Sequence, residues 1–122
     1  MFIQIDFNSE EALYVQLRNQ IILGIATSQL KEGETLPSVR AMADTIGINM
    51  HTVNKAYTCL RQDGFVRVDR RRGAIIAVDM DKLRALAVTK DYLRPIIARA
   101  IVKGITKEEA FELVEEIYKE LQ

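Results

Sequence analysis

Hydrophobic side chains recur every three to four residues over most of the chain, which is the spacing of one helix face. The pattern predicts a first helix from Ser9, its expected N-cap, to about Ser28. Gly33 and Pro37 mark the loop that follows it. Before this helix, residues 2–7 alternate apolar and polar side chains, which predicts a short strand or an extended arm.

Two short helices joined by a tight turn are predicted next. Ser38 is the expected N-cap of the first, and Gly47 ends it, since glycine readily adopts the positive φ of a helix C-terminus. The second helix begins between Asn49 and Thr52 and ends at Gly64. A pair of helices with a short glycine-containing connection is typical of a helix-turn-helix.

A β-hairpin is predicted after the helix pair. Residues 65–69 and 74–78 both suit strands, and residues 70–73 between them are three arginines and a glycine. A hairpin directly after a helix-turn-helix is a wing. Residues 1–78 are therefore predicted to form a winged helix-turn-helix DNA-binding domain.

The rest of the chain is predicted to be helical. Asp81 is placed to cap a helix whose apolar positions continue to Ile101, and Pro95 inside it predicts a kink or a break. After Gly104, Thr106 and Glu109 have the spacing of a capping box for a last helix.

This tail, residues 79–122, is too short to bury its own apolar stripes, and a second copy of the chain is the economical partner. The predicted fold is mostly α with a small β-wing, in which a short two-helix C-terminal region makes a homodimer. The residues expected at the dimer contact are Leu86, Leu93, Ile97, Ile101, Leu113 and Ile117.

The charged residues are unevenly distributed along the chain, although the net charge is zero. Seventeen Lys and Arg balance seventeen Asp and Glu, so the net charge is zero, although a nucleic-acid binder is expected to carry a basic footprint. Basic residues are concentrated between Val66 and Lys90, and glutamates between Glu108 and Glu120. A basic middle and an acidic end leave one face able to attract phosphate. The alternative, from charge alone, is two solvated faces on a neutral protein.

Several function classes are disfavoured by composition. The chain has no apolar run of roughly 18 residues and no signal-peptide pattern, and its single cysteine, Cys59, suits a reducing compartment, so a cytoplasmic location without membrane contact is expected. His51, the one histidine, and Cys59 do not make a zinc site. There is no Ser-His-Asp set and no glycine-rich phosphate loop after a strand. We therefore expect no enzyme activity, no metal and no cofactor.

The third predicted helix carries the candidate chemistry. Its apolar stripe lies opposite a polar face that has no carboxylate through the first two turns, which suits the major groove of DNA. Asn54 could read adenine through a bidentate contact, and Lys55 could reach guanine or a phosphate. The alternative is an ordinary solvated face. The polar side chains are His51, Asn54, Lys55, Thr58 and Gln62.

Two other places suit phosphate. Arg40 lies just after Ser38, where free N–H groups and the helix dipole favour an anion. At the hairpin tip, Arg70, Arg71 and Arg72 repel one another unless an anion is present, which predicts a phosphate or minor-groove contact. The alternatives are a surface arginine and a solvated turn.

The chain resembles the GntR family of bacterial regulators over about residues 5–78, and its short helical tail looks like that of the YtrA-type subfamily. The residues that carry the resemblance are Leu36-Pro37-Ser38-Val39-Arg40, Ala43, Gly47, Asn49, Thr52-Val53, Lys55-Ala56-Tyr57, Leu60 and Gly64, with Tyr14, Gln16 and Gly33 upstream.

The resemblance implies a sequence-specific transcriptional regulator, most often a repressor, that binds a palindromic double-stranded DNA operator as a homodimer. It implies DNA contacts from Ser38, Arg40, Asn49, His51, Thr52, Asn54 and Lys55, with Gly73 as the wing turn. The family's wing often has two glycines around one residue and then an aromatic. Here a single glycine follows the arginines and Ile75 replaces the aromatic, so the wing is expected to sit differently or to act more through charge.

Two other functions remain open at this point. One is a regulator that responds to an unidentified small-molecule effector bound in the tail interface. The other is a winged-helix module that binds a protein partner and never touches DNA.

Overall fold

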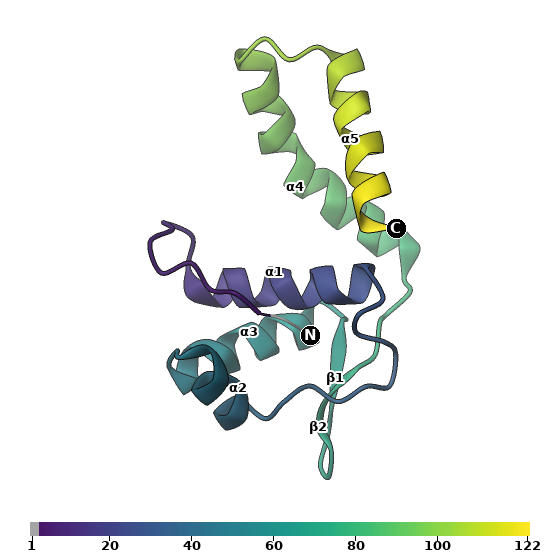
Figure 1. Cartoon of the computed structure of the whole chain (residues 1–122). Helices are drawn as coiled ribbons and strands as arrows, with labels where there is room; N and C mark the ends of the chain where they lie inside the picture. Colours follow the sequence, from purple (N-terminus) through teal and green to yellow (C-terminus); the bar gives the residue numbers. More distant parts are fainter. Residues whose placement is uncertain (1–2) are drawn as a thin grey trace. The chain divides into compact units, whose positions relative to one another are not determined.

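The computed structural model describes residues 3–122, which form two compact units divided after residue 79. The first, here called the N-terminal unit, contains α1 (Leu13–Ala26), α2 (Val39–Ile46), α3 (Met50–Gln62), β1 (Val66–Asp69) and β2 (Gly73–Ile76). The second, called the tail, contains α4 (Lys82–Val102) and α5 (Lys107–Leu121). The described residues thus form a mostly α fold with one small antiparallel hairpin, as the sequence predicts (Figure 1).

The core of the N-terminal unit lies between α1, α2, α3 and the base of the hairpin. Leu17 and Ile21 of α1 and Val53 and Leu60 of α3 are fully buried at 0% exposure. Burial of one such side chain contributes about 1.5–3 kcal/mol to the stability of the folded unit. This burial sets which face of α3 points inward and leaves its opposite face in solvent.

The first helix begins later than predicted. Its N-cap is Ala12, and no side chain among the described residues caps it, so the prediction of Ser9 as N-cap is wrong. Ser9 Oγ instead accepts the N–H of Glu11 at 3.1 Å. Serine side chains that bond to the backbone two residues ahead favour turns, and here a local turn takes the place of the helix start.

The chain before α1 forms no strand over its described residues and lies along α1 as an arm; Phe2 falls outside the described residues. Side-chain amides of α1 hold the arm. Gln16, which is buried, accepts the N–H of Asp6 at 2.9 Å and donates to the carbonyl of Asp6 at 3.0 Å. Gln20 makes the same pair of bonds to Gln4. These amides satisfy backbone groups that a partner strand would otherwise satisfy.

The helix-turn-helix forms as predicted. Ser38 Oγ accepts the N–H of Ala41 at 3.1 Å and caps α2, which ends at Gly47 with a φ of 73°. Asn49 caps α3 by accepting the N–H of His51 at 2.7 Å. Each end is therefore defined by a side chain or backbone conformation that the sequence already indicated.

The wing hairpin pairs Val66 with Ile76 at its base and Asp69 with Gly73 near its tip. The loop before α2 also joins this sheet, because three backbone hydrogen bonds of 2.8 Å link residues 33–36 to β2. We call residues 33–37 the hub loop, since it pairs with the wing and leads directly into α2. From the sequence, this segment is predicted only to be a loop.

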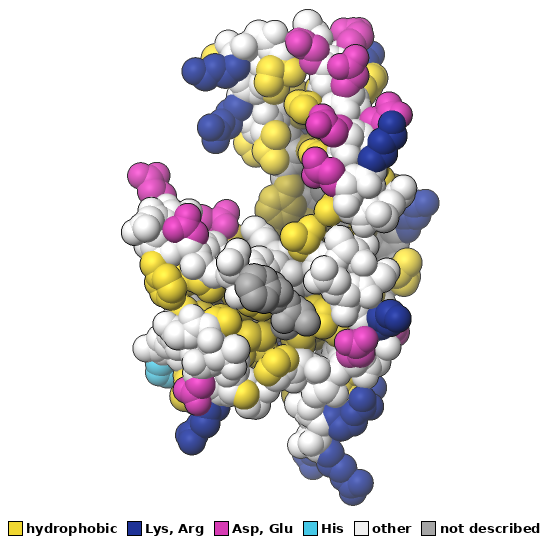
Figure 2. All heavy atoms as spheres, in the orientation of Figure 1, with side chains coloured by type: hydrophobic (Ala, Val, Ile, Leu, Met, Phe, Trp, Pro, Cys, Tyr) yellow, Lys and Arg dark blue, Asp and Glu magenta, His cyan; other side chains and the backbone are white. Residues whose placement is uncertain are grey.

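The tail is a pair of helices joined by a short turn (Figure 1). α4 continues through Pro95, so the break predicted as one alternative does not occur. Asp81 caps α4, and Thr106 and Glu109 form the predicted capping box of α5. Within residues 80–122 no side chain is buried. Figure 2 shows hydrophobic side chains gathered on these helices, with acidic side chains concentrated along α5.

Candidate nucleic-acid interface

The predicted DNA contacts lie on three parts of the N-terminal unit: the start of α2, the first turns of α3 and the wing tip. Basic side chains project at the wing end of this unit (Figure 2). Thr52 is half-buried, and all the other predicted contacts are exposed: Ser38, Arg40, Asn49, His51, Asn54, Lys55, Arg70, Arg71, Arg72 and Gly73.

The orientation of α3 follows from its buried stripe. Val53, Ala56 and Leu60 are fully buried, and Tyr57 is 8% exposed. Because successive side chains of a helix advance by about 100°, Asn54 then points away from the core. The packed core thus presents the polar face of α3 to solvent, as a recognition helix presents its reading face to the major groove.

Tyr57 ties α3 to the hub loop. Its hydroxyl donates a 2.7 Å hydrogen bond to the carbonyl of Pro37, the residue before the α2 cap. Burial raises the pKa of Tyr57 well above its usual value, so the hydroxyl remains a neutral donor at physiological pH. Through this bond the side chain that anchors α3 also holds the start of α2.

Replacing Tyr57 with phenylalanine should destabilise the protein by about 1 kcal/mol, because the Pro37 carbonyl loses its donor while the ring stays buried. Chemical denaturation followed by circular dichroism would measure this loss. Tyr14→Phe is the control, since no hydrogen bond from the Tyr14 hydroxyl is found among the described residues. An equal loss of stability in both variants would contradict the role given to the Tyr57 hydroxyl.

Lys55 does not extend freely from α3. Its Nζ lies 4.2 Å from the centroid of the Tyr14 ring on α1, within the range of a cation–π interaction. The side chain is exposed, yet its charge is directed toward α1. A contact from Lys55 to a base or phosphate would have to compete with this ring.

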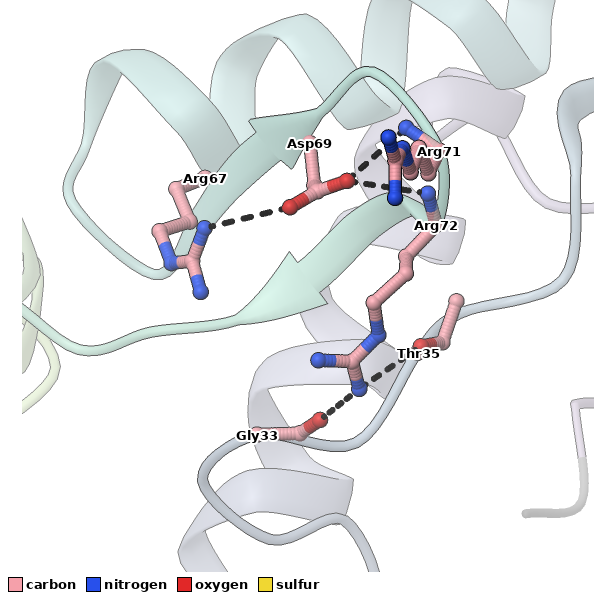
Figure 3. A network of polar contacts seen from close by, with 6 residues as sticks. All are labelled: Gly33, Thr35, Arg67, Asp69, Arg71 and Arg72. Atoms are coloured by element: carbon pink, nitrogen blue, oxygen red, sulfur yellow. Dashed lines mark hydrogen bonds and ion pairs between the residues drawn. The ribbon is translucent and has the colours of Figure 1, made fainter.

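The wing tip is organised by a carboxylate within the hairpin itself. Asp69 Oδ1 accepts the N–H of Arg71 at 2.8 Å and that of Arg72 at 3.1 Å, and Oδ2 lies 3.9 Å from Arg67 Nη1 (Figure 3). Gly73 completes the turn with a φ of 81°, a conformation that strains any other residue. The arginine run therefore has an anion within the hairpin, whereas the sequence pattern predicts only an external anion.

The three wing arginines differ in their surroundings. Arg72 Nη2 donates to the carbonyl of Gly33 at 2.9 Å and lies 3.5 Å from Thr35 Oγ1, so this side chain folds back on the hub loop (Figure 3). In the described part of the chain, the guanidinium groups of Arg70 and Arg71 make no hydrogen bond or ion pair. They are the wing cations that face solvent.

Sequence reasoning missed Asp69, Arg67 and Thr35. Asp69 stands directly before the arginine run at a strand end, where an aspartate commonly accepts backbone N–H groups of a turn, and that signal could have identified it. Arg67 on β1 is a further exposed cation, with 60% of its side chain accessible. No local signal marks Thr35, because its contact comes from a residue 37 positions away.

The pKa of Asp69 is lowered, first by the N–H of Arg71, then by that of Arg72 and by the nearby charges of Arg67 and Arg72. Since the folded pKa lies below the unfolded value of about 3.9, the bonds are fully present above that pH and are lost as pH falls through the folded pKa. Amide NMR signals of Arg71 and Arg72 should therefore titrate below about pH 3.9. The Asp69→Asn variant should remove the titration, and a midpoint at or above the usual value would contradict this account.

Described residues hold no cluster of three or more His, Cys, Asp or Glu side chains that could bind a metal ion. In the same part of the chain, none of the helices combines the length and the hydrophobicity that a membrane span requires. The arrangement instead offers amide, hydroxyl and guanidinium donors on two helix starts and a hairpin tip. Such donors bind phosphates and base edges.

Residues 10–76 match the gntR family of bacterial regulatory proteins. The chain belongs to the GntR family. Together with its winged helix-turn-helix, this membership makes it a DNA-binding transcriptional regulator, and it confirms the resemblance found from the sequence.

This GntR-family regulator is similar to known proteins along nearly the whole length of both chains. It is 32% identical to the HTH-type transcriptional repressor YtrA of Bacillus subtilis, over 94% of this chain and 91% of that protein. The solved structure of YtrA from Sulfolobus acidocaldarius is 36% identical, covers 98% of both chains and superimposes with a TM-score of 0.61. A structure described as a transcriptional antiterminator from Listeria monocytogenes is 31% identical, with a TM-score of 0.86 over 99% of this chain and 92% of that one. The regulator is therefore of the YtrA type.

Proposed function

We propose that this GntR-family regulator binds a palindromic DNA operator as a homodimer and represses transcription there. The observation that carries the proposal is the uncovered apolar surface of the tail. All six residues predicted at the dimer contact are exposed in the single chain: Leu86 57%, Leu93 44%, Ile97 41%, Ile101 68%, Leu113 48% and Ile117 50%.

These side chains favour a second copy of the chain as the partner. Burying a Leu or Ile side chain contributes about 1.5–3 kcal/mol to stability. Six such side chains are exposed in the single chain, so covering them in a dimer would add substantial stability. A two-fold axis lets one surface cover its own copy, which requires no second gene product. Homodimerisation through the tail is the simplest arrangement that buries them.

A two-fold dimer also accounts for an operator with two half-sites. Two recognition helices related by such an axis read inverted repeats about one turn of B-DNA apart, roughly 34 Å. Within each half-site, the exposed Asn54 and His51 at the start of α3 are placed to reach base edges. Ser38 and Arg40 at the start of α2, with Arg70 and Arg71 on the wing, are placed for phosphates.

Repression is supported by the similarity to the Bacillus subtilis repressor YtrA along nearly the whole chain. A dimer bound over a promoter blocks polymerase by occupancy and requires no further domain. The N-terminal unit and the tail together supply what this mechanism needs: a DNA-reading surface and a dimer contact.

The test is selection of bound sequences from random DNA duplexes, followed by fluorescence anisotropy titrations at several salt concentrations. We expect a palindromic consensus that is bound at least about 10³-fold more tightly than random DNA. Binding should weaken steeply with salt, because Lys and Arg displace counterions from phosphates. A duplex with a single half-site is the matched control and should bind much more weakly.

Failure to enrich any sequence, with weak binding throughout, would contradict the proposal. It would favour the two functions left open by the sequence: a regulator that needs an unidentified effector, or a winged helix that binds a protein. The selection would then be repeated with protein purified from cells together with any molecule bound to it. Enrichment of a DNA sequence would favour the effector-dependent regulator, and a bound protein without enrichment would favour the protein-binding module.

A further inference from the structure

Three consecutive arginines occupy the wing tip, and the structure assigns them different surroundings. The Arg72 guanidinium bonds to the Gly33 carbonyl at 2.9 Å and lies beside the Thr35 hydroxyl at 3.5 Å, both on the hub loop (Figure 3). The guanidinium groups of Arg70 and Arg71 have no such partner in the described part of the chain.

The hub loop is connected to every element of the proposed DNA surface. It pairs with β2 through three backbone hydrogen bonds of 2.8 Å, and it runs into the Ser38 cap of α2. Tyr57 of α3 bonds to its last residue, Pro37, at 2.7 Å. A side chain that links the wing tip to this loop therefore relates the wing to both helices of the helix-turn-helix.

We propose that Arg72 is a positioning residue that fastens the wing tip to the hub loop before DNA is bound, while Arg70 and Arg71 supply the phosphate contacts of the wing. The proposal rests on the DNA-binding function proposed above. It divides roles among three adjacent residues of one type, which their sequence alone does not distinguish.

The physical reason is preorganisation. Ordering the backbone of one residue costs about 1–2 kcal/mol, so a hairpin tip that is disordered in the free protein weakens binding when DNA must order it. Asp69 shapes the turn at the tip by accepting the N–H groups of Arg71 and Arg72, but these bonds lie within the hairpin and do not attach it to the rest of the unit. Arg72 attaches the tip to the hub loop, and the guanidinium groups of Arg70 and Arg71 stay exposed, where they can meet a phosphate.

The first readout uses the full-length protein without DNA. Backbone ¹⁵N order parameters of residues 70–73 are compared among the wild type, Arg72→Met, Arg71→Met and Arg70→Met. Methionine replaces the unbranched stem of arginine with one of similar length and removes the guanidinium donors. We expect order to fall from about 0.85 to below about 0.6 in Arg72→Met alone, and to be partly restored in Arg72→Lys, whose ammonium can still donate to the Gly33 carbonyl.

The second readout is the salt dependence of operator affinity. Arg70→Met and Arg71→Met should each reduce the slope of log K against log salt by about 1.8, because each of two subunits loses one phosphate contact at about 0.9 per contact. Arg72→Met should weaken binding but leave this slope unchanged, since the residue contacts no phosphate. If the three substitutions acted only by destabilising the wing, all three would lower operator affinity, and their salt slopes would not differ in this way.

The proposal is overturned if Arg72→Met reduces the slope as Arg71→Met does while the free wing stays ordered. It is also overturned if neither Arg70→Met nor Arg71→Met changes the slope. Failure of the proposed function has a different outcome: the wild type would not discriminate the selected operator from random DNA. In that case the order parameters of the free wing still decide whether Arg72 fastens the tip.

Discussion

Replacing Ile97 with glutamate should convert the proposed dimer into a monomer and weaken operator binding by about 10²–10⁴-fold. Ile97 is 41% exposed on α4 in the single chain, in the apolar stripe expected to meet the partner copy. A carboxylate there would be buried against apolar side chains of the second subunit, which is strongly unfavourable. Each half-site would then be bound independently, and the gain from linking two binding units would be lost.

Sedimentation velocity gives the oligomeric state, and anisotropy on the palindromic duplex gives the affinity. Arg99→Glu is the matched control, because two residues along a helix place it about 200° from Ile97, on the opposite face. It carries the same new charge and should leave the dimer intact. Truncation after Asp79, where the N-terminal unit ends, should reproduce the monomer. A glutamate variant that remains dimeric would refute the tail contact.

Replacing Asn54 with alanine should weaken binding to the selected operator by about 30-fold to about 3 × 10⁴-fold. A bidentate base contact contributes about 1–3 kcal/mol of discrimination, and one substitution in a homodimer removes it from both half-sites, so the total is about 2–6 kcal/mol. Asn54 is exposed on α3, one residue after the buried Val53, and points away from the core. The salt slope should not change, because no phosphate contact is lost.

The measurement is the affinity of the variant for the operator and for versions that carry single base changes. Selectivity should be lost at the symmetric pair of positions that Asn54 reads and retained elsewhere. Glu10→Ala, at an exposed position before α1 and outside the proposed DNA surface, is the control and should bind like the wild type. Arg40→Ala offers a contrast, since a lost phosphate contact lowers affinity for all sequences and flattens the salt slope. If Asn54→Ala binds the operator within about twofold of the wild type, Asn54 does not read a base, and other residues do.

Most of the secondary structure could be read from the sequence because its determinants are local. Ser38, Gly47, Asn49 and Thr106 act on backbone groups within a few residues, and the apolar spacing of each helix is visible over one or two turns. The errors arose where two local signals competed. Ser9 has the side chain of an N-cap but closes its own turn, so α1 begins at Leu13.

The candidate site was predicted at the level of segments, and the roles of individual side chains were not. The sequence indicates that the start of α3 and an arginine-rich wing tip carry the polar chemistry. It contains no signal that Lys55 lies over Tyr14, or that Arg72 turns back while Arg70 and Arg71 face solvent. Residues of the same type take different roles when the fold surrounds them with different neighbours.

By itself, the sequence determined the helix-turn-helix, the wing, the helical tail and the GntR family, because each depends on short-range patterns of apolar, capping and turn residues. Tertiary structure alone decided the pairing of the hub loop with β2, the bond from Tyr57 to Pro37 and the contact from Arg72 to Gly33. These contacts join residues 20 or more positions apart. Such contacts depend on how the packed elements meet in space, and no periodicity along the chain records that geometry.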